Sequence, residues 1–142
     1  MATRGVEDYL ETIYGIVEKK GYARVSEIAS ALRIQPSSVS EMLKRLKEMG
    51  YVDYERYGVI TLTEKGRALA ESVREKHVMI KEFLELLGVS TQIAEADACK
   101  MEHVLDPQTI DRLSSFVRYV KIRGCPKWLM EFKEYAKANP QS

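Results

Sequence analysis

The sequence has 142 residues, of which 45% are hydrophobic, and its 22 basic and 21 acidic residues give a net charge of +1. A chain of this length holds one or two small cores and has no room for a large catalytic scaffold. The balanced charge supplies no global basic field that would indicate nucleic acid. No apolar stretch approaches the roughly 20 residues that a membrane span needs, so we expect a soluble, cytoplasmic protein with no membrane partner.

The N-terminal part has the pattern of three helices. Apolar residues recur at three- and four-residue steps over residues 6–20, and Gly21 ends the pattern as a C-cap glycine. A shorter amphipathic helix is expected over 25–32. After a short turn, Pro36 suits the first turn of a third helix, which ends near Gly50. This order of helix, helix, turn and helix predicts a helix-turn-helix.

The period then changes from helical to alternating. Residues 51–57 and 59–62 are rich in aromatic and β-branched residues and flank a turn at Gly58, which predicts a two-stranded wing. Thr63 can cap a fourth helix that continues to Leu87.

Three further helices are expected in the rest of the chain. They cover about 90–105, 108–122 and a short terminal segment, where Trp128, Leu129, Phe132 and Tyr135 suggest packing on the body of the protein. The predicted fold is mainly α, with a winged helix-turn-helix in residues 1–70 and an all-helical domain in residues 71–142.

The fifth predicted helix carries a stripe of possible metal ligands. Cys99, Glu102 and His103 are spaced i, i+3, i+4, so their sulfur, carboxylate and imidazole point the same way. At about 100° per residue, Glu95 falls on the same third of the helix. Four possible ligands on one face favour a metal site, although many helices carry such a triplet by chance.

Three more candidates lie on other helices. Asp8 and Glu11 are spaced i, i+3 and lie away from the apolar stripe of the first helix, and His77 lies deep in the fourth. Together they could complete a site built from three helices. Ordinary surface acids and a structural histidine remain the alternative. Cys125 is expected to be a small buried thiol at a helix end.

The third helix should enter the DNA major groove, with its exposed early positions meeting base edges or phosphates. Basic residues later in the helix, in the wing and at the start of the fourth helix extend this surface. The alternatives are a solvated charged face and a winged helix that binds protein. The expected DNA contacts are Gln35, Pro36, Ser37, Ser38, Ser40, Lys44, Arg45, Lys47, Arg56 and Lys65.

Five strings carry a resemblance to the DtxR/MntR family of metal-dependent transcriptional repressors: Glu7-Asp8-Tyr9-Leu10-Glu11, Pro36-Ser37-Ser38-Val39, Leu62-Thr63-Glu64-Lys65-Gly66, His77 and Glu102-His103. The resemblance implies a winged domain followed by a dimerisation domain, with divalent metal permitting a homodimer to bind palindromic operator DNA. Its targets would be promoters of metal uptake or homeostasis. The chain looks like the short architecture without an SH3-like domain. The implied ligands are Asp8, Glu11, His77, Cys99, Glu102 and His103.

The identity of the metal depends on Cys99. The manganese-type pattern has a glutamate at this position, and a thiolate is a softer ligand that favours iron(II), cobalt, nickel or zinc. We therefore expect iron(II), followed by manganese(II). A second ion per protomer is also expected to be possible, because Glu11, Glu95, Glu102 and His77 offer oxygen and nitrogen beyond one coordination sphere.

Two other functions fit parts of the pattern. One is a winged-helix regulator that responds to an organic ligand, with the metal stripe incidental. The other is a small metal-dependent hydrolase, because Glu and His beside an ion can activate water. The sequence contains no His-Glu-x-x-His string, and we expect the protein not to be an enzyme.

Overall fold

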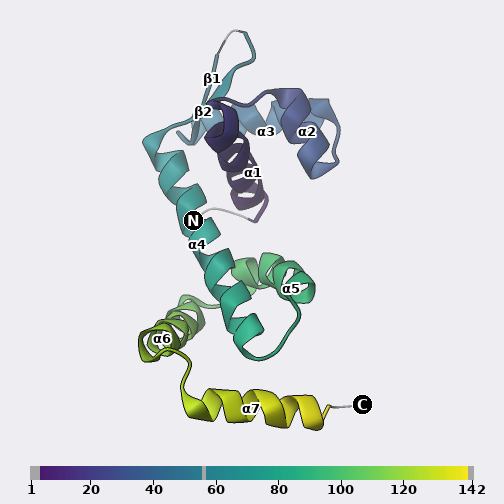
Figure 1. The fold of residues 1–142 in the computed structure, drawn as a ribbon. Helices are drawn as coiled ribbons and strands as arrows, with labels where there is room; N and C mark the ends of the chain where they lie inside the picture. The colour runs from purple at the N-terminus through teal and green to yellow at the C-terminus, as the bar shows by residue number, and fades with distance from the viewer. Residues whose placement is uncertain (1–3, 56, 141–142) are drawn as a thin grey trace. The chain divides into compact units, whose positions relative to one another are not determined.

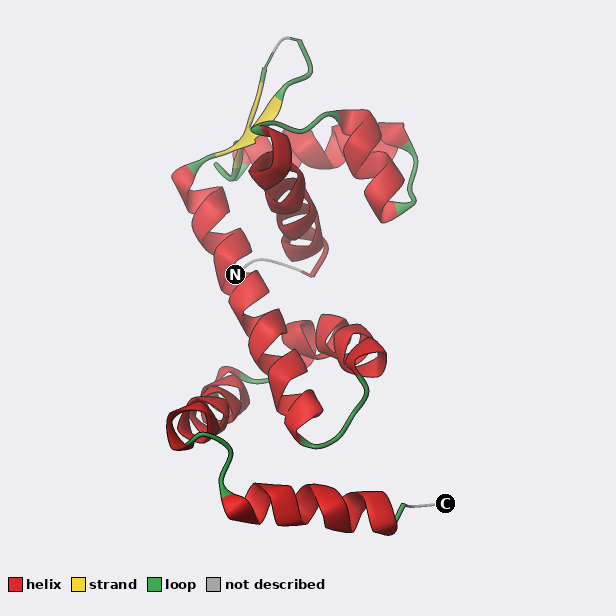
Figure 2. Cartoon of the chain, in the orientation of Figure 1, coloured by secondary structure: helices red, strands yellow, loops and turns green. Residues whose placement is uncertain are grey.

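The computed structural model describes residues 4–55 and 57–140, which are mainly helical (Figures 1 and 2). The predicted order of three helices, a two-stranded wing and further helices is confirmed. The elements are α1 (Arg4–Lys20), α2 (Val25–Leu32), α3 (Pro36–Glu48), β1 (Val52–Tyr54), β2 (Ile60–Leu62), α4 (Glu64–Leu86), α5 (Thr91–Val104), α6 (Pro107–Arg123) and α7 (Lys127–Ala138).

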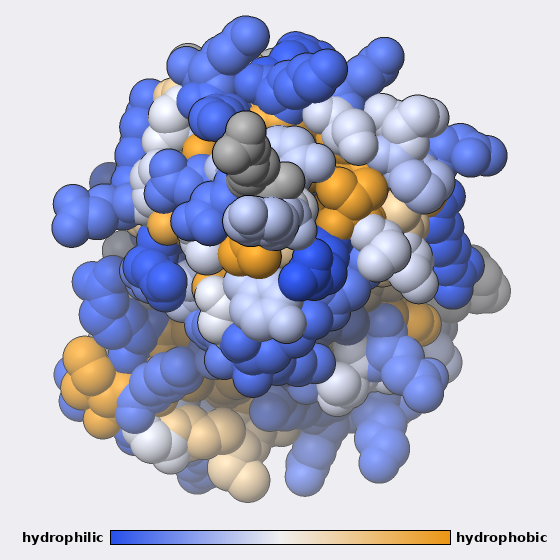
Figure 3. All heavy atoms as spheres, turned by 90° about the horizontal axis from the view of Figure 1, so that it is seen from above, coloured by the Kyte–Doolittle hydropathy of each residue, from blue (hydrophilic) through white to orange (hydrophobic). Residues whose placement is uncertain are grey.

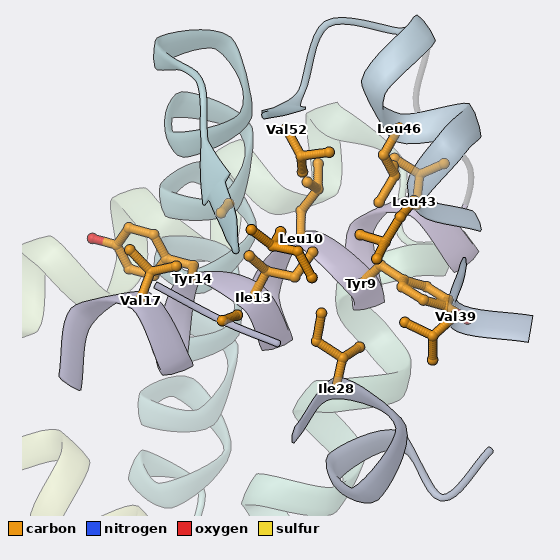
Figure 4. Packing of buried hydrophobic residues seen from close by; sticks show 14 of the residues in the cluster. Tyr9, Leu10, Ile13, Tyr14, Val17, Ile28, Val39, Leu43, Leu46 and Val52 are labelled. Carbon is orange, nitrogen blue, oxygen red and sulfur yellow. The ribbon is translucent and has the colours of Figure 1, made fainter. Parts of the chain in front are cut away.

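The chain divides into two compact units, Met1–Arg74 and Glu75–Ser142. In the first, α1 supplies the centre of an apolar core that α2, α3, both strands and the start of α4 complete. Figure 4 shows Leu10 and Ile13 of α1 among the other buried side chains, with Tyr9 beside Val39 of α3. Burial of these side chains stabilises the unit by roughly 1.5–3 kcal/mol for each large apolar residue.

The wing is shorter than the sequence pattern predicts. Its strands pair antiparallel only from Val52 opposite Leu62 to Tyr54 opposite Ile60. Beyond Tyr54 the chain turns, and the Gly58 amide donates to the Glu55 carbonyl at 3.0 Å. The aromatic and β-branched residues nearest Gly58 therefore belong to the turn.

Polar contacts join α1 to the first part of α4 within the first unit. The Tyr14 hydroxyl donates to Glu71 at 3.1 Å, and Arg74 forms an ion pair with Glu18 at 3.0 Å. Hydrogen bonding to Glu18, burial and hydrogen bonding to Glu71 raise the pKa of Tyr14 to about 12. Tyr14 thus stays neutral across the ordinary pH range and keeps its proton for the bond to Glu71.

The second unit buries few large apolar side chains. Its buried apolar residues in the described part of the chain are Ile80, Ala94, Ala98, Val117, Val120 and Leu129. In α7, Leu129 is buried and the centre of the Trp128 ring lies 6.1 Å from the centre of the Phe116 ring, so these two residues pack as expected. Phe132 and Tyr135 are exposed, and the expectation that they also pack on the body is wrong. The prediction of a buried Cys125 is also wrong, because this residue is exposed in a left-handed turn with φ of 62°.

The surface seen in Figure 3 is mostly hydrophilic, with apolar residues in small separate groups. Within the described residues, the helices are all too short or too polar to cross a membrane.

Gly66 in α4 permits a close approach between helix and wing. A Cβ at this position would overlap the carbonyl oxygen of Tyr51. We expect Gly66→Ala to lower the free energy of unfolding by about 1–3 kcal/mol, because backbone must move to make room. Gly15, in the middle of α1, is the matched control, since a Cβ there meets only the end of Arg74 at 3.9 Å.

Gly15→Ala should raise the free energy of unfolding by about 0.5–1 kcal/mol through the better helix propensity of alanine. Urea denaturation followed by circular dichroism measures both variants. Equal stability of the two alanine variants would contradict the close approach at Gly66.

Candidate metal centre and DNA-reading helix

His77 lies at the centre of a polar cluster in the second unit. It belongs to α4, is only 8% exposed, and has a carboxylate at each ring nitrogen. Its Nδ1 lies 3.0 Å from Oε2 of Glu102, and its Nε2 lies 2.7 Å from Oε1 of Glu95. An ionised carboxylate only accepts hydrogen bonds, so a ring nitrogen of His77 is the donor in these contacts where it carries a proton. A metal ion on His77 would replace such a proton.

Glu102 connects the two histidines of the chain. Its second oxygen, Oε1, lies 3.2 Å from Nε2 of His103, its neighbour in α5. Glu102 is only 5% exposed, and it and His77 are the polar residues that are buried among those described. Burying a charged group is costly unless it is paired, and here each carboxylate oxygen faces an imidazole. The predicted ligand Glu102 is therefore central to the cluster.

Cys99 brings a sulfur atom close to both His77 and Glu95. Ligand atoms of His77, Glu95 and Cys99 all lie within 4.8 Å of one another. Metal–ligand bonds of about 2.0–2.3 Å place two ligands of one ion some 3–4 Å apart, so small side-chain adjustments would suffice. The spacing of Glu95, Cys99 and Glu102 along α5 brings all three to the His77 side, and the donor set fits a divalent transition metal.

Lys81 is a neighbour of the cluster that the sequence interpretation missed. It lies one turn after His77 in α4, and its Nζ contacts Glu95 at 3.2 Å. Burial acts to raise the pKa of Glu95, but hydrogen bonds from His77 and Lys81 outweigh it, and the pKa lies below its ordinary value. Glu95 is thus held as a carboxylate, the form that binds a metal. The i, i+4 spacing of His77 and Lys81 in the sequence could have indicated that the two side chains lie on the same face of the helix.

Asp8 and Glu11 lie on α1, in the first unit, and both are partly exposed. Their spacing places them on one side of the helix, as predicted. Whether they join the ligands of the second unit stays a prediction.

The predicted recognition helix α3 begins at Pro36, with Gln35 as its N-cap. Val39, Leu43 and Leu46 are buried and fix the helix to the core of the first unit. The opposite side of α3 is free for contact with a partner. The predicted DNA residues that are exposed are Gln35, Pro36, Ser37, Ser38, Lys44, Arg45, Lys47 and Lys65, while Ser40 is half-buried.

Two of these lysines also bond within the unit. Lys47 donates to the Tyr54 carbonyl at 3.4 Å, and Lys65 donates to the Met49 carbonyl at 3.0 Å. Both lysines are therefore held beside the wing. Arg56, the predicted contact in the wing, lies outside the described residues.

A winged helix-turn-helix followed in the same chain by a helical unit with a His, Glu and Cys cluster defines a metal-responsive DNA-binding protein. Comparison with known families agrees. Residues 1–60 match the model of the iron dependent repressor N-terminal DNA binding domain, and residues 63–129 match the metal binding and dimerisation domain of the same family.

Known relatives cover most of the chain. The HTH-type transcriptional regulator MntR of Oceanobacillus iheyensis is 44% identical over 85% of this chain and 82% of its own length. MntR of Bacillus subtilis is 40% identical over 84% of each chain. A solved structure described as a manganese-dependent transcriptional repressor in complex with manganese has a TM-score of 0.73 and 26% identity, over 80% of this chain and 53% of that one.

The chain therefore belongs to the DtxR/MntR family of iron-dependent repressors and contains the family's DNA-binding and dimerisation domains. The family consists of metal-dependent transcriptional regulators and not of enzymes, so the expectation of no enzymatic activity is confirmed.

Glu102→Gln should weaken manganese(II) binding at least tenfold, because an amide is a poorer ligand and the two imidazoles lose their shared carboxylate. Glu82→Gln is the matched control, since Glu82 is also an acid of this unit but pairs with Lys121, at 2.7 Å. Isothermal titration of the metal-stripped proteins measures the affinity, and circular dichroism checks the fold. Equal affinities of the two variants would remove Glu102 from the centre.

Proposed function

We propose that this protein is a repressor that binds operator DNA as a homodimer when a divalent transition metal occupies the centre around His77. The observation that carries the proposal is the linked set of Glu95, His77, Glu102 and His103, with Cys99 adjacent. This set lies in the part of the chain that matches a metal-binding domain, and a winged helix-turn-helix precedes it.

Manganese(II) is the first candidate for the metal and iron(II) the second. The carboxylates of Glu95 and Glu102 and the imidazole of His77 suit both ions. The solved relative with bound manganese favours manganese, whereas the family description names iron. Cys99 alone had favoured iron(II), and the relatives reverse that order. Because Glu102 faces both histidines, a carboxylate bridge between two ions is part of the proposal.

Asp8 and Glu11 are proposed to complete the ligand set, on the basis of the family resemblance and the affinity of hard cations for carboxylates. The bound ion supplies positive charge that compensates several acidic ligands at once. The donor atoms of His77, Glu95 and Glu102 already lie close together, so these side chains need to move little to bind an ion. Ligands from α1 would then link metal binding to the orientation of the winged unit. The binding of metal and the binding of operator would each strengthen the other, with a coupling free energy of about 1–3 kcal/mol.

The exposed side of α3 is proposed to read the operator in the major groove. Short polar groups at Gln35, Ser37 and Ser38 would meet base edges, and Lys44 and Arg45 would contact phosphates. A dimer presents two such helices, which accounts for the expected palindromic operator with half-sites one or two helical turns apart.

Metal-dependent DNA binding tests this function. Fluorescence anisotropy of the metal-stripped protein is measured under anaerobic conditions on a duplex from its own upstream promoter. Manganese(II) or iron(II) should tighten binding about tenfold or more at fixed ionic strength, and magnesium should not. The Glu102→Gln variant should respond weakly to metal. Equally tight binding without metal, or release by a small organic molecule alone, would contradict metal control.

The dimer interface is proposed to use the exposed apolar residues of the second unit. Ile93 and Val104 of α5 are exposed and project from the same side of the helix, and Ile122 of α6 is 77% exposed. A stable interface buries about 800 Å² per partner, and the small core of this unit leaves apolar surface for it. A second copy would supply the packing that the unit lacks on its own.

The double variant Ile93→Glu/Ile122→Glu should therefore be monomeric, because two charges would be buried at the interface without partners. Sedimentation equilibrium measures the association. The matched control is Met49→Glu, which places a charge on an exposed apolar residue of the first unit and should leave the dimer intact. A double variant that still forms dimers would place the interface elsewhere.

A further inference from the structure

Arg24 occupies a helix end for which its side chain is unsuited. It is the N-cap of α2, with φ of −127° and ψ of 156°. The residues preferred at this position accept a hydrogen bond through the side chain, whereas a guanidinium has only donors. The reciprocal bond is present instead: Oε1 of Glu27 accepts from the Arg24 backbone amide at 3.0 Å. Helix capping therefore does not explain the arginine side chain.

The guanidinium reaches the turn of the wing. Its Nη1 donates to the carbonyl oxygen of Tyr57 at 3.0 Å, across 33 positions of sequence. The central carbon of the guanidinium, Cζ, lies 5.4 Å from the centre of the Tyr22 ring. This cation–π contact helps to hold the Arg24 side chain toward the wing. Tyr57 lies in the turn that the bond from Gly58 to Glu55 closes.

The neighbouring residue of Arg24 holds the base of the same wing. Ala23 and Ile60 exchange two backbone hydrogen bonds, each of 2.9 Å. The strands β1 and β2 are only three residues long, so they provide little stiffness of their own. Two neighbouring residues thus hold the wing at two points: Ala23 bonds to its base and Arg24 bonds to its turn.

Tyr57 is the residue that this arrangement presents. Its side chain is 80% exposed although it is large and aromatic. A tyrosine ring offers contact area and a hydroxyl at a low cost in conformational entropy, and Tyr hydroxyls are common donors to DNA phosphates.

We propose that Arg24 is a positioning residue that fixes the turn of the wing, so that Tyr57 contacts the DNA backbone beside the groove occupied by α3. This inference rests on the proposed function of DNA binding. It assigns Arg24 an action through Tyr57 and no direct contact with DNA.

Hydrogen exchange of the full chain without DNA tests the contact between Arg24 and the wing. In Arg24→Met, the Glu55 and Gly58 amides should exchange at least threefold faster, while the Ala23 and Ile60 amides keep their wild-type rates. Arg33→Met is the matched control, since Arg33 is an exposed arginine at the other end of α2. Unchanged exchange at Glu55 and Gly58 would overturn the proposal.

A double-mutant cycle tests the action through Tyr57. The metal-loaded full chain and the variants Arg24→Met, Tyr57→Ala and the double variant are titrated with the upstream promoter duplex at several salt concentrations. Each single variant should lose about three- to tenfold in affinity, and the double variant should be no weaker than Tyr57→Ala. The salt dependence of Arg24→Met should match that of the wild type.

The opposite results have distinct meanings. Losses that multiply in the double variant, or a slope against log salt that falls by about one in Arg24→Met, would indicate a direct phosphate contact by Arg24 and overturn the proposal. Failure of the wild-type protein to bind the duplex would contradict the proposed function, and the role of Tyr57 at DNA would fall with it.

Discussion

The contact between His77 and Glu102 is the constraint on which the second unit depends. Two polar side chains are buried in a unit that has only a small apolar core, and each stabilises the fold only while it is paired. The pairing joins α4 to α5, and Glu95 and His103 extend it in both directions. The side chains that hold these helices together are thus the ones suited to bind metal. Metal affinity and the stability of this unit are therefore linked, since an ion that binds the folded cluster stabilises it.

The first unit is stabilised by a different kind of interaction. Its stability comes from an apolar core around α1, and the polar residues of α3 stay outside that core. Buried Val39, Leu43 and Leu46 fix the orientation of α3, so its exposed residues are not needed for the core and are available for the proposed contact with DNA. Polar groups in this unit act at its edges, where Lys47, Lys65 and Arg24 bond to backbone carbonyls in and beside the wing. These bonds hold the wing and the residues around it in a fixed arrangement within the unit.

Local patterns predicted much of this structure. The helix over 25–32 and the cap at Thr63 follow from periodicity and short-range hydrogen bonding, and both agree with the structure. The ligand stripe of α5 was visible in its spacing. The pairing of His77 with Glu102 was not, because it joins residues 25 positions apart. The prediction of a buried Cys125 failed for a related reason, since burial at a turn depends on the placement of neighbouring helices. The wing was predicted too long because aromatic residues suit a turn tip as well as a strand.

The bond between Tyr14 and Glu71 has a consequence for the synthesis of the chain. These residues are 57 positions apart, so their contact closes a loop that contains α2, α3 and both strands. Closing such a loop costs backbone entropy, and the contacts that offset this cost form only when the last part of the loop is present. On the ribosome, α1 therefore keeps part of its surface uncovered until the early turns of α4 have emerged, and the DNA-reading unit matures only after its last helix has arrived.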